Sequence, residues 1–121
     1  MLLGGFGLTF TALSIPTLAS AQDFSWRAYK TTVCNHNANP GDVWPSNSVR
    51  PNTGSFGLCY SLPPQDPWIA LEIDHDFNDG PYAVITYCNR RCQGNASPRQ
   101  KGKYCYTTPQ PDCIISSFSV R

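Results

Sequence analysis

The sequence predicts an all-β fold, a small disulfide-stabilised β-sandwich, on three observations. Eleven prolines and nine glycines interrupt the chain, and no segment sustains a helical apolar period over several turns. Short β-prone runs recur instead between clusters of Pro, Gly and Asn. All six cysteines follow residue 22, and a cysteine-rich domain of this size relies on disulfides because its core is small.

Four runs are the strand candidates: residues 24–29, 68–73, 82–87 and 114–120. In the second run Ile69, Leu71 and Ile73 alternate with Ala70, Glu72 and Asp74. This alternation predicts one buried side and one solvent-facing side. Asn78-Asp79-Gly80-Pro81 supplies a turn into the third run.

The first 21 residues are expected to be a cleaved signal peptide. Met1 to Gln22 carries no charge, and Ala19-Ser20-Ala21 has the small-x-small pattern that signal peptidase reads. We therefore expect residues 22–121 to form one secreted, extracellular domain, in which oxidation of the six cysteines gives three disulfides. With a net charge of +1, the chain lacks the strong overall positive charge that is typical of nucleic-acid-binding proteins.

Two parts of the chain share landmarks in the same order. Tyr29 precedes Cys34 by five residues, as Tyr87 precedes Cys92, and Cys59-Tyr60-Ser-Leu-Pro63 echoes Cys105-Tyr106-Thr-Thr-Pro109. These landmarks predict approximate repeats over 24–75 and 82–121. Pairing equivalent cysteines within each repeat gives Cys34–Cys59 and Cys92–Cys105, and leaves Cys88–Cys113 as the third bridge.

Tyr87, Cys92 and Gly94 have the spacing of the opening hairpin of a βγ-crystallin Greek-key motif, which the second repeat resembles. Ser116–Val120 is similar to the family's serine-bearing strand, whereas His36 stands where the first repeat should have the glycine. The resemblance implies two Greek-key motifs without a built-in catalytic centre. Of the family's calcium ligands only Asp112, Ser116 and Ser117 are present, too few for Ca²⁺, so no metal and no cofactor are expected.

By composition the chain also resembles the small secreted cysteine-rich proteins of fungi, the class from which effectors come. Its best interaction candidate is a run of bases without an intervening acid: Arg90, Arg91, Arg99, Lys101 and Lys103. Such a patch can contact anionic membranes, nucleic acid or acidic wall polymers. Asn95-Ala96-Ser97 is a glycosylation sequon within it, weakened by Pro98.

The function expected from these features is non-enzymatic: a monomeric effector or antimicrobial killer-type toxin that binds at another cell's surface. Its target is a cell-surface component, a cell-wall glycan or a host protein. Two alternatives stay open. A small secreted ribonuclease could use Glu72, His75, His36 and Arg90. A carbohydrate-binding module could stack sugars on aromatic side chains, for which the candidates are Trp26, Tyr60, Trp68, Tyr104 and Tyr106.

Overall fold

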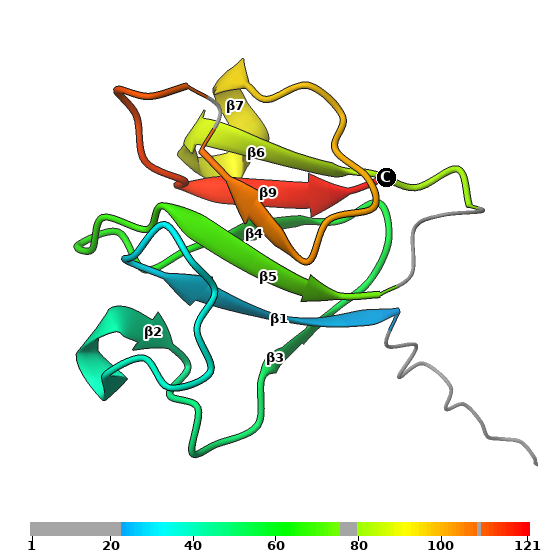
Figure 1. Ribbon diagram of the computed structural model, residues 1–121. Helices are drawn as coiled ribbons and strands as arrows, with labels where there is room; N and C mark the ends of the chain where they lie inside the picture. Colours follow the sequence, from blue (N-terminus) through cyan, green and yellow to red (C-terminus); the bar gives the residue numbers. More distant parts are fainter. Residues whose placement is uncertain (1–22, 76–79, 109) are drawn as a thin grey trace, which may run out of the picture.

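The computed structural model describes residues 23–75, 80–108 and 110–121. The expected signal peptide, residues 1–21, lies outside this range. The described chain forms two antiparallel sheets packed face to face (Figure 1). The all-β sandwich predicted from the sequence is confirmed. Within the described ranges, no helix is long and apolar enough to cross a membrane.

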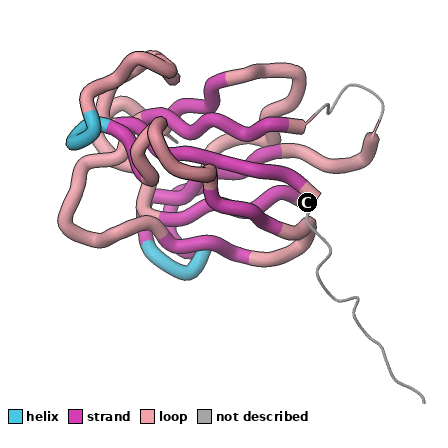
Figure 2. The backbone as a smooth tube through the Cα atoms, turned by 90° about the horizontal axis from the view of Figure 1, so that it is seen from below, coloured by secondary structure: helices cyan, strands magenta, loops and turns pink. Residues whose placement is uncertain are grey.

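Sheet A has the strand order β2-β1-β5-β8, and β3 also pairs with β1. Its strands are β1 (Phe24–Tyr29), β2 (Val43–Trp44), β3 (Asn52–Gly54), β5 (Ala70–Asp74) and β8 (Cys105–Thr107). Sheet B has the order β4-β9-β6-β7 and consists of β4 (Cys59–Ser61), β6 (Val84–Asn89), β7 (Gln93–Ala96) and β9 (Ser117–Val120). Two short 3-10 turns, η2 (Pro40–Asp42) and η3 (Arg90–Cys92), are the helical segments of this part (Figure 2).

The apolar core lies between the two sheets. In β1 the inward residues Phe24, Trp26 and Ala28 alternate with the outward Ser25 and Arg27, which fits a strand with one buried face. Trp26 packs edge-on against Phe118 of sheet B, with ring centroids 4.8 Å apart. The four strand candidates correspond to β1, β5, β6 and β9. The bounds of β1 are the expected ones, and the other three differ by one to three residues at one or both ends.

Each sheet takes one strand from the other half of the chain. Strand β8 of the second half completes sheet A, and β4 of the first half completes sheet B. Read from the opposite edge, sheet B has the order β7-β6-β9-β4, which matches β2-β1-β5-β8 strand for strand. The two halves therefore build equivalent sheets and exchange the strand that bears the Cys-Tyr landmark.

The register of the two sheets is equivalent as well. Tyr29 lies opposite Ala70 in sheet A, and its counterpart Tyr87 lies opposite Ser117 in sheet B. Leu71 lies opposite Tyr106, as Phe118 lies opposite Tyr60. It follows that Glu72, one residue after Leu71, corresponds to Ser119, one residue after Phe118.

The strand exchange corrects two of the expected disulfides. The bridges are Cys34–Cys105, Cys59–Cys92 and Cys88–Cys113. Pairing within each half was wrong for the first two, because β4 carries Cys59 into sheet B and β8 carries Cys105 into sheet A. The expected bridge Cys88–Cys113 is present.

The outer face of sheet A also differs from expectation. Glu72 and Ala70, predicted to face solvent, are only 9% and 0% exposed. The segment between β1 and β2 covers them, and the Cys34–Cys105 bridge ties this segment to β8. Beneath it Tyr29, Cys34, Val43 and Ala70 form a second, smaller core.

A peptide map of the oxidised protein tests the strand exchange. We expect proteolysis without reduction to release a peptide pair joined through Cys34 and Cys105, and another joined through Cys59 and Cys92. Mass spectrometry before and after reduction identifies both pairs. Recovery of Cys34 linked to Cys59 would contradict the exchange, because Cys34 lies in the segment that covers sheet A whereas Cys59 lies in β4 of sheet B.

The contact between the sheets can be tested by truncating one ring. Phe118 is fully buried and contacts Phe24, Trp26 and Tyr60. We expect Phe118→Ala to lower the free energy of unfolding by about 3–5 kcal/mol, because it leaves a cavity between the layers. Chemical denaturation measures the loss. The control is Val33→Ala, whose side chain is 62% exposed and whose effect should stay within about 0.5 kcal/mol.

Candidate functional site

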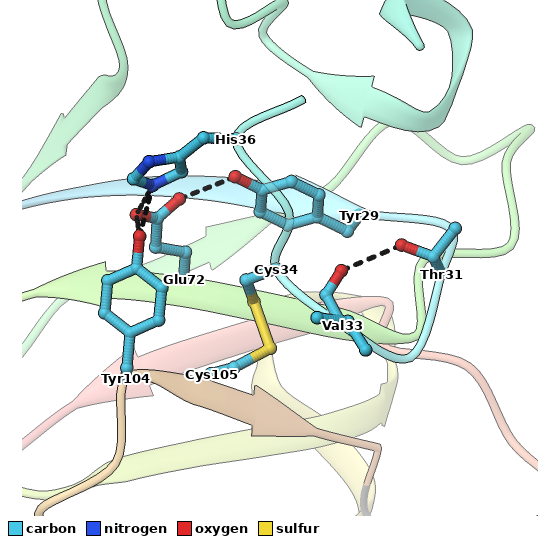
Figure 3. The surroundings of a disulfide bond; sticks show 8 residues. All are labelled: Tyr29, Thr31, Val33, Cys34, His36, Glu72, Tyr104 and Cys105. Carbon is cyan, nitrogen blue, oxygen red and sulfur yellow. Dashed lines mark hydrogen bonds and ion pairs between the residues drawn. A yellow bond between two sulfur atoms is a disulfide. The ribbon is translucent and has the colours of Figure 1, made fainter. Parts of the chain in front are cut away.

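A cluster of polar side chains gathers around Glu72 on the outer face of sheet A. Its members come from β1, from the covering segment, from β5 and from the residue before β8 (Figure 3). The Tyr29 hydroxyl donates to Glu72 Oε1 at 2.6 Å, and His36 Nε2 lies 2.9 Å from Glu72 Oε2. The Tyr104 hydroxyl contacts both Glu72 Oε2 and His36 Nε2. We call Glu72, Tyr29, His36 and Tyr104 the Glu72 cluster.

The hydrogen bonds in this cluster keep Glu72 ionised. Burial by itself raises the pKa of the Glu72 carboxyl, but donors from Tyr104, Tyr29 and His36 outweigh it, so the pKa lies below its usual value. The pKa values of Tyr29 and Tyr104 are raised by burial and by their hydrogen bonds to Glu72. Both phenols therefore remain protonated donors.

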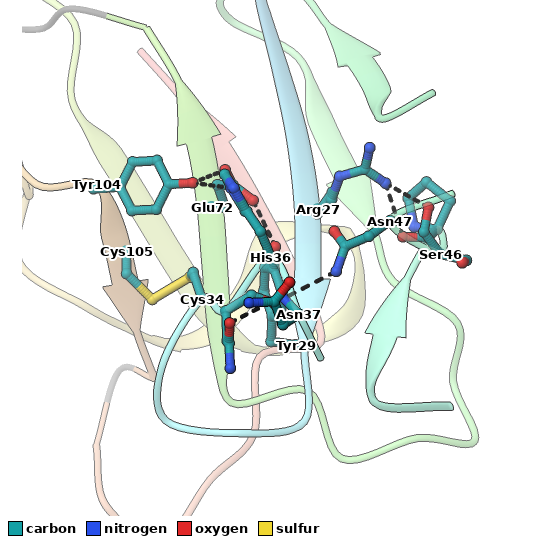
Figure 4. A network of polar contacts seen from close by, with 12 residues as sticks. Arg27, Tyr29, Cys34, His36, Asn37, Ser46, Asn47, Glu72, Tyr104 and Cys105 are labelled. Atoms are coloured by element: carbon teal, nitrogen blue, oxygen red, sulfur yellow. Dashed lines mark hydrogen bonds and ion pairs between the residues drawn. A yellow bond between two sulfur atoms is a disulfide. The ribbon is translucent and has the colours of Figure 1, made fainter. Parts of the chain in front are cut away.

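A cleft of about 300 Å³ opens beside the cluster. Glu72, His36 and Asp74 line it together with Ser25, Trp26, Arg27, Asn47 and Pro51. Arg27 lies opposite Glu72 in the register of β1 and β5, yet its guanidinium turns toward the loop after β2 (Figure 4). There it donates to the carbonyls of Pro45, Ser46 and Val49 at 3.0, 2.7 and 2.7 Å.

Sheet B shows that the same architecture can form without the Glu72 cluster. It has the equivalent tyrosine, Tyr87, and the equivalent disulfide, Cys59–Cys92. By register and spacing, the counterparts of Glu72, His36 and Tyr104 are Ser119, Gly94 and Leu58. The fold is thus built once without the polar cluster, so the Glu72 cluster is not a requirement of the fold.

The structure brings together only part of the residues expected for a ribonuclease. Glu72 and His36 are in contact. His75 packs instead against the ring of Phe56, and Arg90 donates to the Leu62 carbonyl at 2.6 Å on sheet B. Sequence reasoning missed Arg27 and Tyr29 as site residues. The alternation of β1 places both on one face, but their pairing with β5 could not be read from the chain.

The predicted basic patch divides into two groups. Val84, at one end of β6, pairs with Gln100, whereas Asn89, at the other end, pairs with Gln93. The run from Arg99 to Lys103 therefore starts near one end of β6, whereas Arg90 and Arg91 come directly after its other end. The five bases do not form one continuous surface along this strand.

Three of the five bases share a groove of about 430 Å³ between β7 and β8. No acid is among its described lining residues, which are Ser97, Pro98, Arg99, Gln100, Lys101, Lys103, Thr107 and Thr108. Arg99 donates to the Pro81 carbonyl at 2.8 Å, and Lys101 to the Gly80 carbonyl at 2.5 Å. We call this surface the basic groove. Asn95, the residue of the sequon, is exposed on β7.

Most of the aromatic side chains expected to stack on sugars are in the core. Trp26 is 4%, Trp68 3% and Tyr106 0% exposed, and Tyr60 packs against the same core. Tyr104 alone among the five is half exposed, at 50%. The structure therefore builds no platform of several aromatic rings from these residues.

The partial calcium motif is used within the fold. The Ser117 hydroxyl accepts from the backbone N–H of Cys92 at 2.8 Å and donates to the Asn89 carbonyl at 2.5 Å. Its oxygen thereby holds η3 against β9. Asp112, the acid of the same motif, lies exposed in a turn.

Replacement of Glu72 by Gln tests the electrostatics of the cluster. Because the folded-state pKa of Glu72 is lowered, the ionised carboxyl stabilises the protein above its unfolded-state pKa of about 4.3. This stabilisation is lost as the pH falls through the folded-state pKa. We expect Glu72→Gln to be less stable than the wild type at neutral pH, and the difference to shrink at about pH 3.

Denaturant unfolding at both pH values measures this difference. Asp112→Asn, in an exposed turn and outside the cluster, is the control for loss of a carboxyl. A Glu72→Gln deficit that stays constant down to the acid pH would show that ionisation of Glu72 does not stabilise the fold.

Comparison of the chain with protein-family models, with curated proteins and with solved structures finds no match. What the protein does must therefore be inferred from its fold, the Glu72 cluster and the basic groove.

Proposed function

We propose that this protein is a secreted effector or antimicrobial toxin that binds a negatively charged surface of another cell through the basic groove. The observation that carries the proposal is the grouping of Arg99, Lys101 and Lys103 around one groove whose described lining contains no carboxylate. Cations without a paired acid produce a positive potential that attracts anionic surfaces. Such binding does not require the protein to catalyse a reaction.

The groove presents its cations on a supported segment rather than on a free loop. Gln100 exchanges backbone hydrogen bonds with Val84, at 2.8 and 3.0 Å. The Ser97 hydroxyl accepts from the Thr86 N–H at 3.0 Å, and the Lys103 N–H donates to the Tyr106 hydroxyl at 3.3 Å. Ordering of this segment before binding lowers the entropy that association costs.

Three disulfides support an extracellular location, because such bridges form and persist in oxidising compartments. Secretion by cleavage of residues 1–21 is part of the proposal. We also propose that the two halves are βγ-crystallin-like Greek-key motifs. The equivalent strand orders of the two sheets and the exchange of β4 and β8 support this relationship.

Charge-removing variants test the basic groove. We expect Lys101→Ser/Lys103→Ser to weaken binding to vesicles of anionic phospholipid about 30-fold, since each cation near such a surface contributes about 1 kcal/mol. The control, Arg50→Ser/Arg91→Ser, removes the same charge from exposed residues outside the groove and should bind nearly as well as wild type. Cosedimentation at increasing salt measures both variants.

Equal weakening by the two variants would show that net charge rather than the groove drives binding. Binding to zwitterionic vesicles as strong as to anionic ones would contradict an electrostatic contact. An acidic polysaccharide in a parallel assay decides between a lipid and a wall polymer as the anionic surface. Dose–viability curves on fungal, bacterial and plant cells then show which cell is affected, and reduced protein is the control.

A further inference from the structure

The Glu72–His36 contact has the geometry of an oriented general base. Glu72 is ionised and can only accept hydrogen bonds, so the imidazole donates its Nε2–H to Glu72 Oε2. In the neutral ring Nδ1 then holds the free lone pair. Figure 3 shows this second nitrogen on the side of the ring away from Glu72. The His36 side chain is 66% exposed and lines the cleft, so this nitrogen is accessible to a ligand.

We propose that the sheet A cleft cleaves RNA, with His36 as the general base, Glu72 as its positioning residue and Arg27 as the cation that faces the phosphate. This activity goes beyond the surface binding proposed above and is independent of the basic groove. It differs from the expectation of a non-enzymatic protein.

The residues of the cleft favour a substrate that carries its own nucleophile. The only hydroxyl among the described residues that line it is that of Ser25, which lies opposite Asp74 rather than opposite Glu72. Cleavage of a glycosidic bond requires a protonated carboxyl as acid, and Glu72 has a lowered pKa. RNA needs neither group, because its 2′-hydroxyl lies next to the bond to be broken.

Arg27 is the one group among the described residues of the cleft that can attract a phosphodiester to the side of His36. Arg27 and Glu72 are register partners on one face of the sheet, but the loop carbonyls hold the guanidinium away from the carboxylate. The cation is therefore not neutralised by Glu72 and retains an attraction for phosphate oxygens. Asp74 repels phosphate at its own end of the cleft. The half-exposed Tyr104 ring beside His36 can stack on a base.

The proposed step is an internal transesterification. His36 Nδ1 takes the proton of the 2′-hydroxyl as the 2′-oxygen forms a bond to phosphorus. The bond from phosphorus to the 5′-oxygen of the next nucleotide breaks, and the imidazolium returns the same proton to that oxygen. The products are a 2′,3′-cyclic phosphate and a free 5′-hydroxyl, with no net gain or loss of protons.

Cleavage of a short end-labelled oligoribonucleotide by the oxidised protein tests this inference, and the DNA of the same sequence is the substrate control. We expect RNA fragments that end in a 2′,3′-cyclic phosphate, and intact DNA. His36→Gln retains a donor for Glu72 but has no basic nitrogen, so it should lower kcat/KM about 10²- to 10⁴-fold. His75→Ala, which changes the other histidine of the chain, should cleave within about threefold of wild type.

Glu72→Gln has its own readout. Glu72 holds the Nε2–H tautomer of His36 through the Nε2–Oε2 contact, so ¹⁵N NMR of the imidazole should show this tautomer in the wild type and a weaker preference for it in Glu72→Gln, in addition to any loss of rate. A purely structural role of Glu72 would lower the rate and leave the tautomer unchanged. Circular dichroism and the disulfide map establish that each variant is folded. If His36→Gln does not fold, His36→Ala replaces it as the test variant.

Intact RNA after incubation with folded wild-type protein would overturn the inference. Equal cleavage by wild type and His36→Gln would do the same, since it would trace the activity to another site or to a contaminant. Lys101→Ser/Lys103→Ser separates the two proposals: it should lose binding to anionic vesicles and still cleave the short RNA.

Discussion

The exchange of β4 and β8 between the two sheets is the constraint on which the rest of the structure depends. Neither sheet is complete without a strand from the other half of the chain. The Cys59–Cys92 and Cys34–Cys105 bridges each tie an exchanged strand to the half that receives it. Because these disulfides join distant parts of the chain, they remove much of the freedom of the unfolded state.

The same constraint creates the candidate site. Strand β8 brings Tyr104 and Cys105 to sheet A, and the Cys34–Cys105 bridge holds the covering segment with His36 over Glu72. A carboxylate that would otherwise be solvated becomes buried, and three donors compensate for the water it loses. Sheet B repeats the strands, the tyrosine and the bridge without these polar groups. The difference between the halves therefore identifies the residues that the fold alone does not explain.

One segment, between β7 and β8, contributes to both surfaces. Lys101 and Lys103 line the basic groove, and the next residue, Tyr104, belongs to the Glu72 cluster. The segment serves both because it leaves sheet B at β7 and enters sheet A at β8. The proposed surface for anionic binding thus lies close along the chain to the proposed cleavage site, although the two proposals rest on different side chains.

The sequence by itself determined the fold class and four of the strand regions. Local patterns suffice for these features: short β-prone runs between clusters of Pro, Gly and Asn, and no sustained helical period. The Cys88–Cys113 bridge was expected only as the pair left over after two bridges that proved wrong. Only the tertiary structure decided the other two bridges, the burial of Glu72 and its contact with His36, Tyr29 and Tyr104. Those features depend on which distant strands pair, and no local periodicity specifies a partner many residues away. The landmarks of both repeats were visible in the chain, but the exchange of strands between them was not.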